Sequence, residues 1–193
     1  MKIRKENNME ATILAANLNR LIGATKAFIS QNDRRPKHQY IRIDFCKETQ
    51  NATAVAIDGY RLAVENATCT VDEDFTVYIK AVLPKATRGG YVAVKLNDNI
   101  CYLSSGENLT GFRQPGGDFL DYQKTISDIT EKPAVYRIGF NGDYLLQALQ
   151  AAKISCGGFK TPVVLEFREP QIPIVLRTHK DDIKIVLPVR LHD

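Results

Sequence analysis

The chain has 193 residues, of which 44% are hydrophobic, enough to bury one good core. It carries 26 basic and 22 acidic residues, and this mild net charge of +4 permits a polyanionic partner without demanding one. No apolar run approaches the roughly 18 residues that a membrane span needs. The polar residues 1–9 lack the apolar segment of a secretory signal, and the widely spaced cysteines suit a reducing compartment, so we expect a cytoplasmic protein with no membrane partner.

Cysteine and histidine positions argue against a metal centre. No two of the four cysteines form a Cys-x-x-Cys pair, and the three histidines lie in polar or terminal segments without ligand spacing. Three of the cysteines sit in apolar, strand-like runs, where a free thiol behaves as a small hydrophobic group. We therefore expect no metal and no cofactor.

The first 70 residues predict a strand, a helix and three more strands. The expected strand at 10–15 leads into a helix over 17–30, in which Leu18, Leu21, Ile22 and Thr25 fall on one face. Arg20, Gly23, Ala24 and Ala27 lie on the opposite face. Strand-like runs follow at 40–46, 52–57 and 60–69.

The same order returns twice. A second cycle has a strand at 75–79, a short helical piece around 80–87, and strands at 91–96, 100–104 and 108–113. A third has a strand at 135–140, Asn141 as N-cap of a helix over 144–153, and strands at 163–167, 172–177 and 183–191. Repetition of one unit predicts an α+β fold of three strand-helix-three-strand repeats with antiparallel sheets. An α+β domain with three incidental helices is the alternative.

The organisation that follows has four parts. Residues 1–9 form an N-terminal tail, and residues 10–126 form a complete two-repeat domain. Residues 127–134, which overlap the C-terminal part of a stretch at 116–133 rich in turn formers and charge, are interpreted as a linker. Residues 135–193 form a half-domain of a single repeat.

Four short motifs, in chain order, resemble the bacterial DNA polymerase III β subunit, the sliding clamp. Residues 56–63 read Ala-Ile-Asp-Gly-Tyr-Arg-Leu-Ala where that family usually has Ala-Thr-Asp-Gly-His-Arg-Leu-Ala. Residues 117–122 read Gly-Asp-Phe-Leu-Asp-Tyr where it usually has Gly-Glu-Phe-Pro-Asp-Tyr. Residues 138–149 are similar to the opening of its last half-domain, and Leu-Pro-Val-Arg-Leu at 187–191 to its C-terminal signature. The resemblance implies a DNA-clamp-like fold.

The chain is identified as a reduced relative of this family. Family members have three domains of two repeats each, and this chain has no counterpart of the first domain or of the first half of the last one. A ring of this family contains twelve repeats, so three repeats a chain would need four chains. We therefore expect a homo-oligomer, a dimer or a tetramer.

The resemblance implies a DNA polymerase processivity factor that encircles double-stranded DNA and contacts phosphates without reading bases. In the family the helices face the hole of the ring, so basic residues in or beside the predicted helices are the candidates. Solvated surface charges are the alternative for each of them. The candidates for DNA binding are Arg20, Lys26, Arg34, Arg35, Lys80, Lys85, Arg88 and Lys153.

The family also has an apolar groove that receives short peptides from DNA polymerases and clamp loaders. An aliphatic floor with an aromatic residue and an arginine at its rim suits an amphipathic peptide. Leu62, Ile185 and Leu187 could instead be ordinary strand core. The matching positions are Ile57, Gly59, Tyr60, Arg61, Leu62, Leu120, Thr125, Ile185, Leu187, Pro188 and Val189.

Catalysis is not expected. Asp58, Asp118 and Asp121 could be imagined as the carboxylates of a metal-dependent nuclease, but Asp58 and Asp118 lie in turn-forming contexts that explain them. No Gly-rich phosphate loop or Ser-His-Asp set is evident. A non-encircling adaptor that binds partner peptides only is the other alternative to a working clamp.

Overall fold

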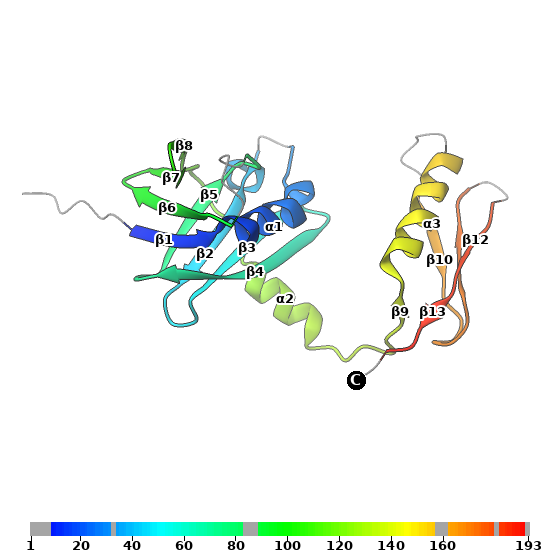
Figure 1. Ribbon diagram of the computed structural model, residues 1–193. Coiled ribbons are helices and arrows are strands. Elements are labelled where there is room, and N and C mark those ends of the chain that lie inside the picture. Colours follow the sequence, from blue (N-terminus) through cyan, green and yellow to red (C-terminus); the bar gives the residue numbers. More distant parts are fainter. Residues whose placement is uncertain (1–8, 32–33, 83–88, 157–161, 180–181, 192–193) are drawn as a thin grey trace, which may run out of the picture. The chain divides into compact units, whose positions relative to one another are not determined.

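The computed structural model describes residues 9–31, 34–82, 89–156, 162–179 and 182–191. The chain divides into two compact units, Met1–Asp121 and Tyr122–Asp193. The first unit is built mainly from strands, and a long helix stands out in the second (Figure 1). No helix among the described residues is long and apolar enough to cross a membrane.

The described residues of the first unit form an eight-stranded antiparallel sheet with one α-helix packed on it. Its strands are β1 (Met9–Leu14), β2 (Ile41–Cys46), β3 (Asn51–Ile57), β4 (Leu62–Val71), β5 (Phe75–Ile79), β6 (Tyr91–Asn97), β7 (Ile100–Ser105) and β8 (Asn108–Arg113). Its helical elements are α1 (Ala15–Thr25) and the 3₁₀ turns η1 (Lys26–Phe28) and η2 (Pro36–Gln39). The strand order in the sheet is β5-β2-β3-β4-β1-β6-β7-β8.

Two repeats interlock to make this sheet. The first repeat supplies β1 and the run β2–β4, and the second supplies β5 and the run β6–β8. The first strand of each repeat pairs with the second strand of the other repeat. β1 of the first repeat pairs with β6 of the second, and β5 of the second pairs with β2 of the first. Neither repeat therefore completes its sheet alone.

Alternating side chains place the core of the first unit. In β2, Ile41, Ile43 and Phe45 are buried, whereas the intervening Arg42 and Asp44 are only half-buried, as the two-residue period of a strand requires. Helix α1 packs on β3 and β4 and adds the predicted apolar face to this core. Full burial of each such aliphatic side chain contributes about 1.5–3 kcal/mol.

Helix α1 is shorter than predicted. The hydroxyl of Thr25 donates a 2.7 Å hydrogen bond to the carbonyl of Leu21, one turn back, and the α-helix ends at this residue. Such a bond from a β-branched residue favours bending or ending a helix. The chain continues through η1 and is extended at Ile29, so the expected helical residues 29 and 30 are not helical.

The side chain of Gln114 links the two outermost strands of the sheet, β5 and β8. The amide oxygen of Gln114, just after β8, accepts a 2.7 Å hydrogen bond from the backbone N–H of Tyr78 in β5. Its amide nitrogen donates 3.0 Å bonds to the carbonyls of Tyr78 and Phe112. The side chain thus pairs with the backbone as a neighbouring strand would.

The second unit is a helix on small antiparallel sheets. Its elements are α2 (Tyr122–Thr130), β9 (Gly139–Phe140), α3 (Gly142–Ser155), β10 (Val164–Glu166), β11 (Ile174–Arg177), β12 (Lys184–Val186) and β13 (Pro188–Val189). The sheets have the orders β10-β11-β12 and β13-β9. Ile174, Leu176 and Val186 are buried, with Leu145 and Ala148 of α3 packed against them.

The predicted N-cap of α3 is confirmed. The side-chain oxygen of Asn141 accepts hydrogen bonds from the backbone N–H groups of Asp143 (3.0 Å) and Tyr144 (3.2 Å). These contacts satisfy two of the four donors that a helix N-terminus leaves without partners.

Several sequence-based elements differ from the structure. The predicted linker begins inside α2, so its residues 127–130 are helical, and the strand expected at 135–140 is reduced to β9. Residues 80–82 are not helical, and most of the helix expected there lies outside the described residues. The strand expected at 183–191 is divided into β12 and β13. The division into domains and a linker stays a prediction.

Candidate functional site

The Asp-Gly corner of the first motif is fixed by its own side chains. Gly59 has a φ of +92°, which an L side chain rarely adopts, so the turn needs glycine there. One carboxylate oxygen of Asp58 accepts from the backbone N–H groups of Tyr60 (3.0 Å) and Arg61 (3.2 Å), and the other forms a 2.8 Å ion pair with Arg61. These bonds to the ionised form, that of the Arg61 side chain first, hold the pKa of Asp58 below its usual value.

The same corner contacts the 3₁₀ turn η1, which follows helix α1. Arg61 donates a 2.8 Å hydrogen bond to the carbonyl of Ala27, and its guanidinium lies 5.2 Å from the ring centroid of Phe28. Arg61 therefore positions the corner, whereas Tyr60 beside it is 98% exposed. Ile57 is buried, and Leu62, at the start of β4, is half-buried.

Within the first unit, the second motif packs on the residues around His38 through Phe119, an aromatic residue that sequence reasoning did not single out. The Phe119 ring lies edge-on to His38, with centroids 5.1 Å apart, and 5.3 Å from the guanidinium of Arg42. His38 is only 3% exposed, although it falls in a polar segment of the sequence. Burial, and then the nearby positive charge of Arg35, lowers the pKa of His38. Leu120, next to Phe119, is 38% exposed.

In the second unit, the predicted groove residues Ile185 and Leu187 are not core, because they are 59% and 68% exposed. They line a hollow of about 550 Å³ beside Tyr144 of α3. Pro188 and Val189 line another hollow, of about 620 Å³. Thr125 lies in α2 and is half-buried.

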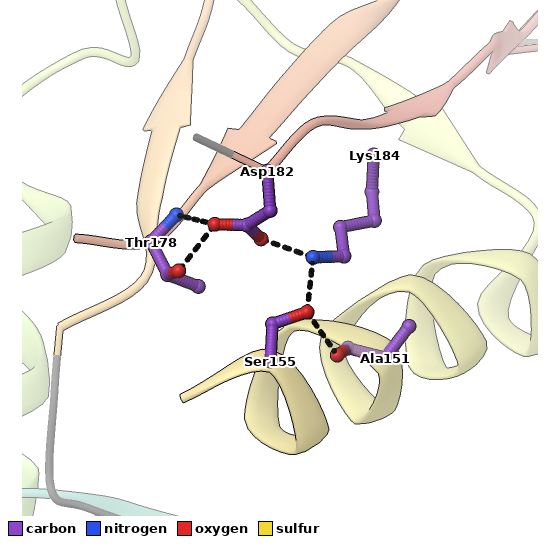
Figure 2. A network of polar contacts seen from close by, with 5 residues as sticks. All are labelled: Ala151, Ser155, Thr178, Asp182 and Lys184. Atoms are coloured by element: carbon purple, nitrogen blue, oxygen red, sulfur yellow. Dashed lines mark hydrogen bonds and ion pairs between the residues drawn. The ribbon is translucent and has the colours of Figure 1, made fainter. Parts of the chain in front are cut away.

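A polar network holds strand β12 against the C-terminal end of α3 (Figure 2). The Lys184 ammonium donates a 2.8 Å hydrogen bond to the Ser155 hydroxyl and forms an ion pair with Asp182. The same carboxylate accepts from the backbone N–H (3.2 Å) and the hydroxyl of Thr178. These bonds, led by the one from Lys184, lower the pKa of Asp182 to about 2. Ser155 is the last residue of α3, so its bond from Lys184 ties the helix into the network, and its hydroxyl donates a 3.1 Å hydrogen bond to the carbonyl of Ala151 one turn back (Figure 2).

The basic candidates for DNA binding are distributed over both units. Lys26 in η1 is exposed, whereas Arg20 on α1 forms a 2.7 Å ion pair with Glu65. The Lys80 ammonium, after β5, lies 5.2 Å from the ring centroid of Tyr40. The remaining candidates are Arg34 and Arg35 before η2, Lys153 in α3, and Lys85 and Arg88, which lie outside the described residues.

No metal-binding constellation is present among the described residues, which hold no group of three or more His, Cys, Asp or Glu side chains able to share an ion. Asp58, one of the imagined nuclease carboxylates, is engaged by its own turn. Asp118 and Asp121 are exposed.

Comparison with known proteins decides the fold. No family model and no curated protein matches the sequence. The structure is similar to a DNA polymerase III beta subunit from Eubacterium rectale, with a TM-score of 0.81 and 13% identity over 97% of this chain and 52% of that one. The DNA polymerase sliding clamp of Bacillus subtilis matches with a TM-score of 0.77 and 16% identity over 97% of this chain and 50% of that one.

The chain has the sliding-clamp fold. The beta subunit of Streptococcus pyogenes agrees, with a TM-score of 0.72 and 18% identity over 98% of this chain and 52% of that one. The predicted resemblance and the α+β fold class are therefore confirmed. The chain spans about half the length of these clamp structures, as expected of a reduced relative.

Proposed function

We propose that this chain acts in a sliding-clamp-like processivity factor, which holds a DNA polymerase on duplex DNA without reading its sequence. The similarity of 97% of the chain to a clamp structure at a TM-score of 0.81 carries this proposal. A non-catalytic role follows, because a clamp contributes topology and contacts rather than chemistry.

The composition of α1 supports a DNA-facing role for this helix. Residues 11–30 contain Arg20 and Lys26 and no acidic residue. The exposed residues of the helix include Gly23 and Ala24, so little side chain stands between its backbone and a partner. A phosphate backbone can approach such a surface closely, and its affinity comes from charge rather than from base contacts.

Lys26 offers the cleanest test, because Arg20 also holds Glu65. We expect the full chain to bind two duplexes of unrelated sequence with equal affinity in fluorescence anisotropy at low salt. For Lys26→Ala, the slope of log affinity against log salt concentration should fall by about 0.9, the value for one phosphate contact. Lys47→Ala removes the same charge from the exposed β2–β3 turn and should leave the slope unchanged. Equal slopes for the two variants would reject the segment of α1 and η1 as the DNA-binding element.

The alternative function is an adaptor that binds partner peptides without encircling DNA. Large apolar side chains at predicted groove positions favour peptide binding, since Tyr60 and Leu187 are 98% and 68% exposed. Peptides selected from a displayed library should lose affinity on Tyr60→Ser and retain it on Tyr91→Ser, a matched change at an exposed tyrosine of β6.

Retention on DNA separates the two functions. A clamp should stay on circular duplex DNA at a salt concentration that abolishes equilibrium binding, and should be lost when the circle is cut. Peptide binding without either retention or equilibrium DNA binding would instead establish the adaptor.

A further inference from the structure

In the third repeat, β9 and β10 each have one strand edge without a partner among the described residues. β9 pairs with β13, and β10 pairs with β11, which leaves the other edge of each strand open. Unpaired backbone donors and acceptors at such an edge are a template for another strand. In the first unit, the corresponding edges are the ones through which the two repeats interlock.

The strand sequences of the third repeat can be aligned with those of the first two repeats. The opening strands read Met-Glu-Ala-Thr-Ile at 9–13, Phe-Thr-Val-Tyr-Ile at 75–79 and Tyr-Arg-Ile-Gly-Phe at 136–140. Ile13 and Phe140 both directly precede the N-cap of a helix, which fixes their alignment. The following strands read Ile-Arg-Ile-Asp-Phe at 41–45, Val-Ala-Val-Lys-Leu at 92–96 and Val-Val-Leu-Glu-Phe at 163–167.

Each interlocked pair in the first unit carries a complementary polar contact at the second position of the opening strand. Glu10 lies opposite Lys95 and forms a 3.0 Å ion pair with it. Thr76 lies opposite Asp44 and donates a 2.6 Å hydrogen bond to it. The equivalent residues of the third repeat are Arg137 and Glu166, which have opposite charges.

Apolar pairs flank this polar contact in the first unit. Phe75 lies opposite Phe45, and their stacked rings have centroids 4.7 Å apart. The equivalent residues of the third repeat are Tyr136 and Phe167, which are 47% and 44% exposed. With Ile138 and Phe140 they line an open hollow of about 330 Å³.

The exposed residue at the centre of β10 indicates that this strand lacks a partner strand. Val94 and Ile43, at the centre of the interlocked strands, are both 0% exposed, whereas the equivalent Leu165 is 40% exposed. Apolar area left in water at a position that is dry in both templates is what a partner strand would cover.

We propose that the occupant of these edges is the third repeat of a second copy of this chain. β9 of each copy pairs with β10 of the other about a two-fold axis, as β1 pairs with β6 and β5 with β2. Arg137 of each copy then lies opposite Glu166 of the partner subunit, so the charge contact is made twice. A self-complementary interface of this kind is the usual basis of a homodimer.

A charge-exchange experiment on the full chain tests this pairing without DNA or a polymerase. Sedimentation over about 1–100 µM should show a dimer, twice the 21.6 kDa of one chain. Arg137→Glu and Glu166→Lys each place like charges at both crossings, so each should weaken dimerisation by about 10- to 100-fold. An equimolar mixture of the two variants should recover a heterodimer with both ion pairs intact. Glu169→Lys, at an exposed position, is the matched control.

A crosslink gives a second readout, because Glu166 also forms 2.9 Å ion pairs with Arg168 and Arg177 of its own chain. Residues directly opposite on antiparallel strands are close enough for a disulfide. The variant with both Arg137→Cys and Glu166→Cys should form an intermolecular 137–166 disulfide, and the single Arg137→Cys variant should not. A monomer throughout the concentration range, a wild-type-like dimer for Arg137→Glu, or no 137–166 crosslink would each overturn the proposal.

Discussion

Gln114 closes the sheet of the first unit, and removing its amide tests how much this contact stabilises. The substitution Gln114→Met keeps the length and the apolar part of the side chain but deletes three hydrogen bonds, two to Tyr78 and one to Phe112. A typical intramolecular hydrogen bond contributes about 0.5–1.5 kcal/mol net. Tyr78 is only 8% exposed, so water replaces these partners poorly. We expect the free energy of unfolding of the first unit to fall by about 2–3 kcal/mol.

Denaturant unfolding of the full chain measures this loss, and hydrogen exchange locates it at the backbone N–H of Tyr78. Gln31→Met, at an exposed position, should change stability by less than about 0.5 kcal/mol. Gln114→Glu should be no better than Gln114→Met at neutral pH, because a carboxylate cannot donate to the carbonyls of Tyr78 and Phe112. If exchange at Tyr78 is equally slow in Gln114→Met and the wild type, the side chain does not close the sheet.

Three further changes probe the helix cap and two titrating groups. Asn141→Ala should destabilise the second unit by about 1 kcal/mol in denaturant unfolding, whereas Asn141→Ser keeps an acceptor and most of the stability. The folded-state pKa of His38 lies below the ordinary 6.5, so between these two pKa values the unfolded state binds more protons than the folded state. Stability should therefore be full above pH 6.5 and fall as the pH drops, and His38→Phe should remove this slope. Asp182 has a folded-state pKa of about 2 against 3.8, so its contribution is full above pH 3.8 and lost as the pH falls through 2. Asp182→Asn should reduce the loss of stability between pH 3.8 and 2. An unchanged loss in this variant would assign it to other carboxylates.

The strand framework could be predicted because its signals are local. Alternation in residues such as Ile41, Ile43 and Phe45 reports burial on one side of a strand, and Asn141 before an apolar helix face reports a cap. Helix α2 was missed because its segment is polar and of mixed charge. Only Tyr122 of that helix is buried, so little apolar periodicity marks it.

Predicting the site was harder because its contacts are distant in sequence. The burial of His38 depends on Phe119, some 80 residues further along the chain, and no local pattern joins them. Likewise, the sequence around Gln114 does not show that its amide meets Tyr78. The family resemblance predicts Arg61 in the peptide groove, and its bonds to Asp58 and Ala27 show that it also positions the corner.

The charged position in the interlocking strands also bears on how the chain avoids misfolding. Three repeats with similar strands could exchange partners during folding, which is a hazard of repeat proteins. Pairing β1 with β10 would set Glu10 against Glu166, and pairing β9 with β6 would set Arg137 against Lys95. Each exchange would place like charges opposite each other, whereas the native β1–β6 pair has the ion pair between Glu10 and Lys95. The charged residue at this position thus disfavours an exchange of the opening strands β1 and β9 between the first and third repeats.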